Sequence, residues 1–343
     1  RLPNSRIENK KTRRVGIAGA AERQPPIISQ TRRNDRIQKT VRSKRLNKMA
    51  EGEFEYLVFL GCAIPYRVST YEISTRKVME KLGVKLEEMP EFNCCGLPMD
   101  PVSHEMMLLL AARNLCMAEE KNMNIMALCP GCAGTLNKVN TMLKNDKKLR
   151  EEINGYLKED GLGFKGTIEV RHLIRVLNED VGVEKIRAAV KKPLKGLKVA
   201  EHNGCHVLRP KEYMGFDDPE DPKVLKALIE ATGAECLDYI GESQCCGAPT
   251  AGINDNIPLQ LSREKLTNVR DVGAQALITI CPFCHMMFET NQMRIERMFN
   301  EKFGIPTLHY PQLLGLALGL SPQELALDEL RVKPTEQLKQ LGM

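Results

Sequence analysis

Short apolar runs alternate with segments of helical periodicity along most of the chain. In the first half, apolar runs predict strands at Tyr56–Cys62, Val84–Met89 and Ile125–Leu128. Apolar residues three and four positions apart predict helices at Arg67–Leu82, Ser103–Lys121 and Ala133–Lys144. Strands that alternate with helices in this way are typical of parallel βαβ units.

The second half repeats this order of elements. Strands are expected at Leu197–Ala200, Glu235–Ile240 and Ala276–Ile280, and helices at Pro222–Thr232, at Pro258–Val272 and through Met298. The ends of the halves also correspond, because TIEVRHLIRVL (Thr167–Leu177) matches TLHYPQLLGL (Thr307–Leu316). The sequence therefore predicts an α/β protein of two similar, Rossmann-like parallel-sheet domains. They derive from an internal duplication, and we expect them to be related by pseudo-two-fold symmetry.

We place the N-terminal domain at residues 49–190 and the C-terminal domain, with a helical tail, at residues 191–343. The expected linker is Glu179–Lys195. Residues 1–48 hold 15 basic and 3 acidic residues and no aromatic residue, so we expect them to be disordered or not native to the protein. The remaining residues carry 35 basic and 41 acidic groups, and this balance predicts no nucleic-acid partner.

The overall composition, 42% hydrophobic and 27% charged, is ordinary for a soluble globular protein. No apolar run approaches the roughly 18 to 20 residues that span a bilayer, and no secretory signal is evident. We therefore expect a cytoplasmic protein without a membrane partner. A P-loop is absent, and GIAGAA at residues 16–21 follows no convincing strand, so we expect no flavin or nucleotide in this chain.

Ten of the 12 cysteines fall into one pattern that occurs twice. Each copy has a single cysteine, then a CCG triplet, then a CPxC motif, and the predicted strands place all of them beyond carboxyl strand ends, where open parallel sheets bind ligands. The first set is Cys62, Cys94, Cys95, Cys129 and Cys132, and the second is Cys205, Cys245, Cys246, Cys281 and Cys284.

Three chemistries compete for these thiols. Disulfides are disfavoured because five is an odd number and the expected compartment is reducing. Structural zinc takes four ligands, which leaves one thiol of each set in surplus. Iron–sulfur clusters are held by thiolates, and a fifth cysteine suggests an extra or bridging ligand. The residues favour iron–sulfur and leave zinc open.

The residues around the thiols fit cluster binding. Gly96 and Gly247, in the CCG triplets, have no Cβ and allow the backbone to approach an inorganic core closely. Pro98 and Pro249 stiffen the following loops. The CPGC and CPFC motifs open helices, where free amides and the helix dipole favour thiolates.

The words FNCCGLP with CPGC, and SQCCGAP with CPFC, resemble the cysteine-rich CCG-domain family. Within it the chain is most similar to the B subunits of cytoplasmic heterodisulfide reductases of methanogenic archaea, over about Glu53–Gly319. The resemblance implies that each five-cysteine set holds a noncubane 4Fe–4S cluster. It also implies reduction of the mixed disulfide of coenzyme M and coenzyme B in an electron-bifurcating complex of methanogenesis. Our interpretation is that each cluster gives one electron to the disulfide and captures one of its two sulfur atoms at iron.

The resemblance further implies partners that deliver electrons. These are the iron–sulfur C-type and the flavin- and iron–sulfur-bearing A-type components of the reductase, fed by a hydrogenase or formate dehydrogenase. Two alternatives remain. One is an electron-transfer subunit of another oxidoreductase, such as succinate:quinone reductase or a glycolate- or lactate-oxidising system. The other is a structural subunit that carries zinc.

Anionic groups of the two coenzymes would need cations, and four basic residues close to the cysteines are candidates: Arg67, His206, Arg209 and Lys211. A solvated basic face is the alternative for each. His285 has either a substrate role or a packing role. His172 and His309 occupy equivalent places and are predicted to be structural. Cys116 and Cys236 lie outside the pattern and are predicted to be small buried hydrophobic residues.

Overall fold

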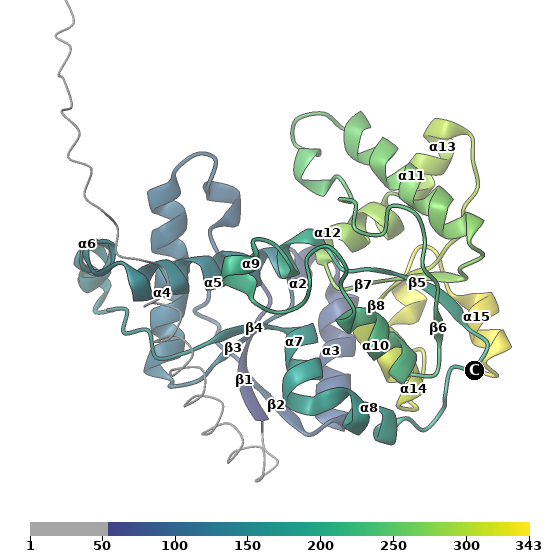
Figure 1. Cartoon of the computed structure of the whole chain (residues 1–343), viewed down its shortest axis with the longest axis horizontal. Coiled ribbons are helices and arrows are strands. Elements are labelled where there is room, and N and C mark those ends of the chain that lie inside the picture. Colours follow the sequence, from purple (N-terminus) through teal and green to yellow (C-terminus); the bar gives the residue numbers. More distant parts are fainter. Residues whose placement is uncertain (1–53) are drawn as a thin grey trace, which may run out of the picture. The chain divides into compact units, whose positions relative to one another are not determined.

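The computed structural model describes residues 54–343, which form one compact unit (Figure 1). The expected basic extension, residues 1–48, lies outside the described residues. Two four-stranded sheets are present, and every strand pair in them is parallel. The first sheet has the order β2-β1-β3-β4, from β1 (Phe54–Phe59), β2 (Val84–Glu87), β3 (Ile125–Ala127) and β4 (Val170–His172). The second has the order β6-β5-β7-β8, from β5 (Lys198–His202), β6 (Glu235–Cys236), β7 (Ala276–Thr279) and β8 (Thr307–His309).

Helices connect the strands in the predicted alternation. In the first half they are α2 (Ile64–Arg67), α3 (Ser69–Lys81), α4 (His104–Glu120), α5 (Pro130–Asn145), α6 (Lys147–Leu157), α7 (Leu173–Arg175) and α8 (Val183–Ala189). In the second half they are α9 (Lys211–Met214), α10 (Val224–Ala231), α11 (Asn256–Asp271), α12 (Pro282–His285), α13 (Gln292–Phe299), α14 (Tyr310–Ala317) and α15 (Thr335–Gln340). The α/β class and the two similar parallel-sheet domains are confirmed. Within residues 54–343, no helix has the length and apolar character needed to cross a membrane.

The strand order of each sheet positions the cysteines. In the first sheet the chain moves from β1 outward to β2 and then returns past β1 to β3, so a topological switch point lies between β1 and β3. Ligand crevices of open parallel sheets form at such points, beyond the carboxyl ends of the strands. Cys62 follows β1 and Cys129 follows β3 at this point, and Cys205 and Cys281 follow β5 and β7 in the second sheet.

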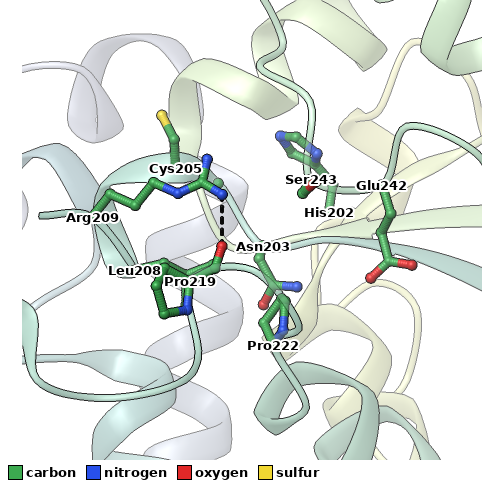
Figure 2. A pocket seen from close by; sticks show the side chains of 10 residues that line it. His202, Asn203, Cys205, Leu208, Arg209, Pro219, Pro222, Glu242 and Ser243 are labelled. Atoms are coloured by element: carbon green, nitrogen blue, oxygen red, sulfur yellow. Dashed lines mark hydrogen bonds between the residues drawn. The ribbon is translucent and has the colours of Figure 1, made fainter. Parts of the chain in front are cut away.

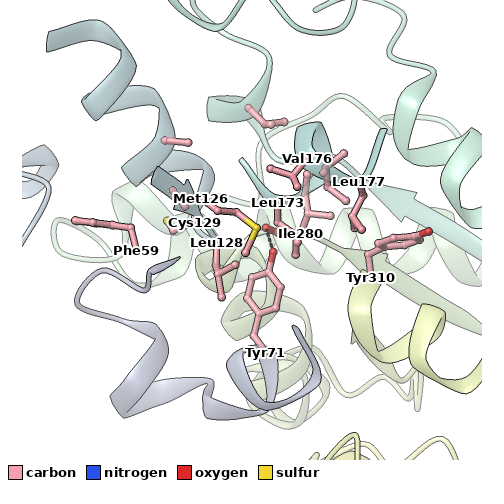
Figure 3. Close-up of a cluster of buried hydrophobic side chains, with 14 of the residues drawn as sticks. Phe59, Tyr71, Met126, Leu128, Cys129, Leu173, Val176, Leu177, Ile280 and Tyr310 are labelled. Atoms are coloured by element: carbon pink, nitrogen blue, oxygen red, sulfur yellow. Dashed lines mark hydrogen bonds between the residues drawn. The ribbon is translucent and has the colours of Figure 1, made fainter. Parts of the chain in front are cut away.

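The two halves share one hydrophobic core. Tyr71, Val78 and Met79 of α3 are fully buried, and α3 packs along α14, all eight residues of which are buried. The Tyr71 hydroxyl donates a 3.0 Å hydrogen bond to the Ile280 carbonyl of the other half, within a cluster that also includes Cys129 (Figure 3). This packing fixes the carboxyl edges of the two sheets relative to each other.

Two predicted elements have other boundaries in the structure, and the expected linker contains helices. The expected linker is largely helical, because Glu179 continues a π-helical segment (Val176–Gly182) that leads into α8. The helix expected through Met298 is divided into α12, a π-helical segment (Met286–Thr290) and α13. The strand expected at Glu235–Ile240 pairs over only two residues, since the chain then leaves the sheet and the Tyr239 hydroxyl bonds to the Glu201 carbonyl.

Candidate metal centre

The CPxC motifs place two thiols at the first turn of a helix. Cys129 is the N-cap residue of α5, with φ −98° and ψ 125°, and Cys281 is the N-cap residue of α12, with φ −123° and ψ 126°. The proline that follows each cysteine suits the first helical position, because it has no N–H to satisfy and its φ is already helical. All four motif cysteines are buried, next to the positive end of a helix dipole.

The CCG triplets bend sharply against the next helix. Gly96 has φ +92° and Gly247 has φ +84°, a region that favours glycine. A Cβ on Gly96 would lie 2.7 Å from the Met107 carbonyl oxygen of α4, and one on Gly247 would lie 2.6 Å from Pro258 Cα of α11. Both positions therefore exclude a side chain. Each glycine N–H also donates to the first thiol of its triplet, at 3.5 Å in the first half and 3.3 Å in the second.

Nine of the ten patterned thiols influence one another's pKa in one continuous series. Within each half the interactions follow the motifs, and Cys284 Sγ donates a 3.3 Å hydrogen bond to Cys246 Sγ. The two halves meet at Cys281 and Cys129, which shift each other's pKa, and a Cβ on Gly204 would lie 3.3 Å from Cys281 Cβ and 3.7 Å from Pro130 Cγ. The full series runs Cys94, Cys95, Cys132, Cys129, Cys281, Cys284, Cys246, Cys245 and Cys205. The tenth thiol, Cys62, interacts electrostatically with Cys94.

These interactions favour thiolates at three positions. The neighbouring thiols of Cys132 and Cys94 lower the pKa of Cys95 to about 4. The neighbouring thiols of Cys132 and Cys281 hold the pKa of Cys129 well below its usual value. The neighbouring thiols of Cys205 and Cys246 lower the pKa of Cys245 to about 2. Since the thiolate is the form that binds metal, the site is prepared for metal ligation.

Sequence reasoning missed three residues beside the thiols. A Cβ on Gly61, which has φ +67°, would lie 2.8 Å from Cys132 Sγ. His202 Nε2 lies 3.2 Å from Cys284 Sγ, and His202, Cys246 and Cys284 have potential ligand atoms within 4.8 Å of one another. Lys265 is 1% exposed and interacts electrostatically with several thiols of the second set. Only the position of His202, three residues before Cys205, was a usable signal in the sequence.

The basic substrate candidates are not all brought together. His206 Nδ1 lies 3.2 Å from Cys205 Sγ. Arg209 lines a small cavity with Cys205 and His202, but its guanidinium donates to the Pro219 carbonyl at 2.6 Å (Figure 2). Arg67 is exposed and lines a different cavity, one that His285 also lines. Lys211 is exposed on α9.

The residues predicted to be structural are buried. His172 is 1% exposed and His309 is fully buried, at the ends of the equivalent strands β4 and β8. His172 Nε2 lies 3.0 Å from the Leu128 carbonyl oxygen, and His309 stacks between Tyr71 and His285 with ring centroids 3.9 and 4.0 Å apart. Cys116 lies in α4 and Cys236 in β6, and both are buried.

The fold and the thiols define a protein of two cysteine-rich domains. The cysteine-rich CCG domain matches residues 56–137 and again residues 199–289. Heterodisulfide reductase B subunits are similar over nearly their whole length. The B subunit of the ferredoxin/F420H2-dependent CoB–CoM heterodisulfide reductase of Methanosarcina acetivorans is 37% identical, over 83% of this chain and 96% of that protein. The B subunit of a ferredoxin:CoB–CoM heterodisulfide reductase of Methanosarcina mazei is 36% identical over the same shares.

Other similarities are broader. The 8-methylmenaquinol:fumarate reductase membrane anchor subunit of Wolinella succinogenes is 30% identical, over 80% of this chain and 95% of that protein. A solved structure of a hypothetical protein from Helicobacter pylori has a TM-score of 0.66 at 19% identity, and it supports the fold alone. The match covers 82% of this chain and about half (52%) of that one.

The chain, which contains two CCG domains, belongs to the family of heterodisulfide reductase B subunits. Membership of this family implies that the chain is one subunit of a multisubunit oxidoreductase.

Proposed function

We propose that this chain is the catalytic subunit that reduces the mixed disulfide of coenzyme M and coenzyme B to the two thiols. The observation that carries the proposal is the close approach of the two five-cysteine sets at Cys281 and Cys129, which shift each other's pKa, and at Gly204, which lies beside both Cys281 and Pro130. A disulfide has two sulfur atoms and takes up two electrons when it is cleaved. Two adjacent sets of metal ligands suit a substrate that divides into two thiolates.

The donor sets fit iron–sulfur centres. Each half offers five thiols, and in the first half a Cβ on Gly61 would lie only 2.8 Å from Cys132 Sγ. The first centre would be held by Cys62, Cys94, Cys95, Cys129 and Cys132, and the second by Cys205, Cys245, Cys246, Cys281 and Cys284. We propose that both are noncubane 4Fe–4S clusters, and such centres supply one-electron transfer. Gly96 and Gly247 shape the two sites.

We further propose that the electrons come from the C-type and A-type components of an electron-bifurcating complex, and from a hydrogenase or formate dehydrogenase. The names of the Methanosarcina relatives, which include ferredoxin and F420H2 as donors, support a donor outside this chain. The domain limits of 49–190 and 191–343 also stay a proposal.

The test is to measure iron and sulfide in anaerobically purified chain and then its reaction with the mixed disulfide. We expect about eight irons per chain and oxidation of the dithionite-reduced protein by the disulfide. Cys129→Ser removes a ligand at the junction and should abolish this reaction. Cys116→Ser alters a buried thiol of the same half outside the pattern and should retain it. Iron-free protein, or full activity of Cys129→Ser, would refute the proposal.

A second candidate is an electron-transfer subunit of another oxidoreductase. The similarity to the fumarate reductase subunit of Wolinella succinogenes favours it, because that protein is matched over 95% of its length. In this case the chain would carry iron and accept electrons, but the mixed disulfide would not oxidise it. A structural subunit would instead contain zinc, for which His202, Cys246 and Cys284 offer a mixed set of ligands.

A further inference from the structure

The surroundings of the two cysteine sets differ at equivalent positions. The glycine of each CCG triplet contacts the helix that follows it, Gly96 at Met107 of α4 and Gly247 at Pro258 of α11. Asn114 in α4 follows Met107 by seven residues, and Lys265 in α11 follows Pro258 by the same number, so the two positions are equivalent. Both side chains are buried, at 0% and 1% exposure. A neutral amide in the first half is thus replaced by an amine in the second.

Both residues donate hydrogen bonds to carbonyls of the loop that carries the CCG triplet, but they differ in charge. Asn114 Nδ2 donates to the Cys94 carbonyl at 3.1 Å. Lys265 Nζ donates to the carbonyls of Gly241 and Glu242, at 2.6 and 3.1 Å, in the loop before Cys245. Three carbonyl or hydroxyl oxygens, the third being the Tyr239 hydroxyl at 3.2 Å, satisfy the ammonium group. Burial lowers the pKa of Lys265 to about 8, so the amine is still mainly protonated at neutral pH.

A second replacement lies on the strand side of the same thiols. Phe59, three residues before Cys62, contacts the ring of Phe92 at a centroid distance of 5.1 Å. At the equivalent place, three residues before Cys205, His202 directs Nε2 at Cys284 Sγ, 3.2 Å away. Figure 2 shows His202 on the cavity beside Cys205. An apolar ring in the first half is therefore replaced by a group able to donate a hydrogen bond to sulfur.

Nearby acidic groups only partly offset this difference. Glu201 is 1% exposed, and burial together with the neighbouring Glu242 raises its pKa well above the usual value, which disfavours the charged carboxylate. Glu242 is half-buried, where solvent screens its charge more than that of a buried group. Lys265 therefore carries the main buried charge near the second cysteine set.

We propose that Lys265 and His202 make the C-terminal centre easier to reduce than the N-terminal centre. The inference rests on the proposed iron–sulfur function. When a one-electron donor, an iron–sulfur or flavin group, reduces a centre, the centre gains one negative charge and the donor loses one electron. A buried cation and a hydrogen bond to a ligating sulfur both stabilise the more negative state. The first electron therefore resides on the C-terminal centre.

The test is a dithionite titration of the whole chain followed by paramagnetic resonance. Lys265→Gln removes the charge and should lower the potential of the C-terminal centre by at least a tenfold change in its electron equilibrium, about 59 mV for one electron. Lys265→Arg should largely restore it. Lys144→Gln, which alters a partly buried lysine of the other half that bonds to the Ile168 carbonyl, should leave both potentials unchanged.

His202→Phe gives the second half the residue of the first and should lower the same potential, so it serves if Lys265→Gln does not fold. Signals are assigned to centres with Cys62→Ser and Cys245→Ser. Both potentials unchanged in iron-loaded Lys265→Gln or His202→Phe would overturn the inference and leave the proposed function intact. A wild-type chain without iron would instead overturn the proposed function.

Discussion

The close approach of the CCG triplet to α11 makes Gly247 a sensitive position. In Gly247→Ala, the new methyl group would meet Pro258 Cα at 2.6 Å and the Leu261 side chain at 3.1 Å. The obstruction at Pro258 is backbone, which cannot move without shifting α11. Gly273 provides a matched control, because it has φ +76° and nothing within 4 Å of an added Cβ. Both substitutions impose the same backbone strain, and only the first creates a clash.

The two contributions have separate magnitudes. Placing an alanine in the left-handed region costs about 1–2 kcal/mol of folding free energy at either glycine. Overpacking a well-filled site costs about 1–3 kcal/mol more, and this applies only to Gly247. We therefore expect Gly273→Ala to lose about 1–2 kcal/mol and Gly247→Ala about 2–5 kcal/mol.

Urea unfolding followed by far-ultraviolet circular dichroism measures both values, from the midpoint and the slope. Bound iron should fall in Gly247→Ala but not in Gly273→Ala, because the Gly247 N–H donates to Cys245 Sγ and moves with the triplet. Equal destabilisation by the two substitutions would refute the argument, since it would show that α11 withdraws from the added methyl group at no cost.

Two further predictions concern buried polar groups of the first half. Arg171, with its side chain 5% exposed, pairs with the fully buried Asp180, so Arg171→Met should cost about 3–5 kcal/mol of unfolding free energy in urea. Arg187→Met breaks only an exposed pair with Glu184 and should cost less than about 1 kcal/mol; equal losses would contradict the burial argument. Burial lowers the pKa of His172 to about 4, so the unfolded chain binds its proton first as the pH falls. The contribution of His172 to the free energy of unfolding should be fully present above pH about 6.5. About 3 kcal/mol of it should be lost as the pH falls towards 4. His172→Gln should flatten that part of a urea-midpoint against pH curve, and an unchanged slope would show that His172 is not the titrating group.

The sequence was most informative where the physical constraint was local. The CPxC motifs, the CCG triplets and the alternation of strands and helices were all visible as short patterns, and the structure contains the corresponding turns and parallel sheets. Strand ends were predicted less well. The predicted strand Glu235–Ile240 pairs with β5 only at Glu235 and Cys236, because the chain then turns toward the thiols. Local periodicity contains no information on where a partner strand ends.

Contacts between the halves were outside the reach of pattern analysis. The proximity of Cys281 and Cys129 depends on α3 packing along α14, and no spacing in the chain encodes that packing. Lys265 was missed for a related reason. A lysine in an amphipathic helix ordinarily extends into solvent, and only the fold shows that this one is enclosed by carbonyl oxygens.

The duplication separates what the metal ligands require from what their surroundings supply. All five cysteines and the CCG glycine recur in each half, as ligand geometry demands, whereas Phe59 and Asn114 give way to His202 and Lys265. Folding alone does not explain the second pair. Asn114 shows that an amide can bond to a carbonyl of the CCG loop, and a buried ammonium group has a greater desolvation cost than an amide. A costlier residue at an equivalent place, with its charge beside thiolates, points to selection for the electrostatic potential at the second set of sulfur atoms.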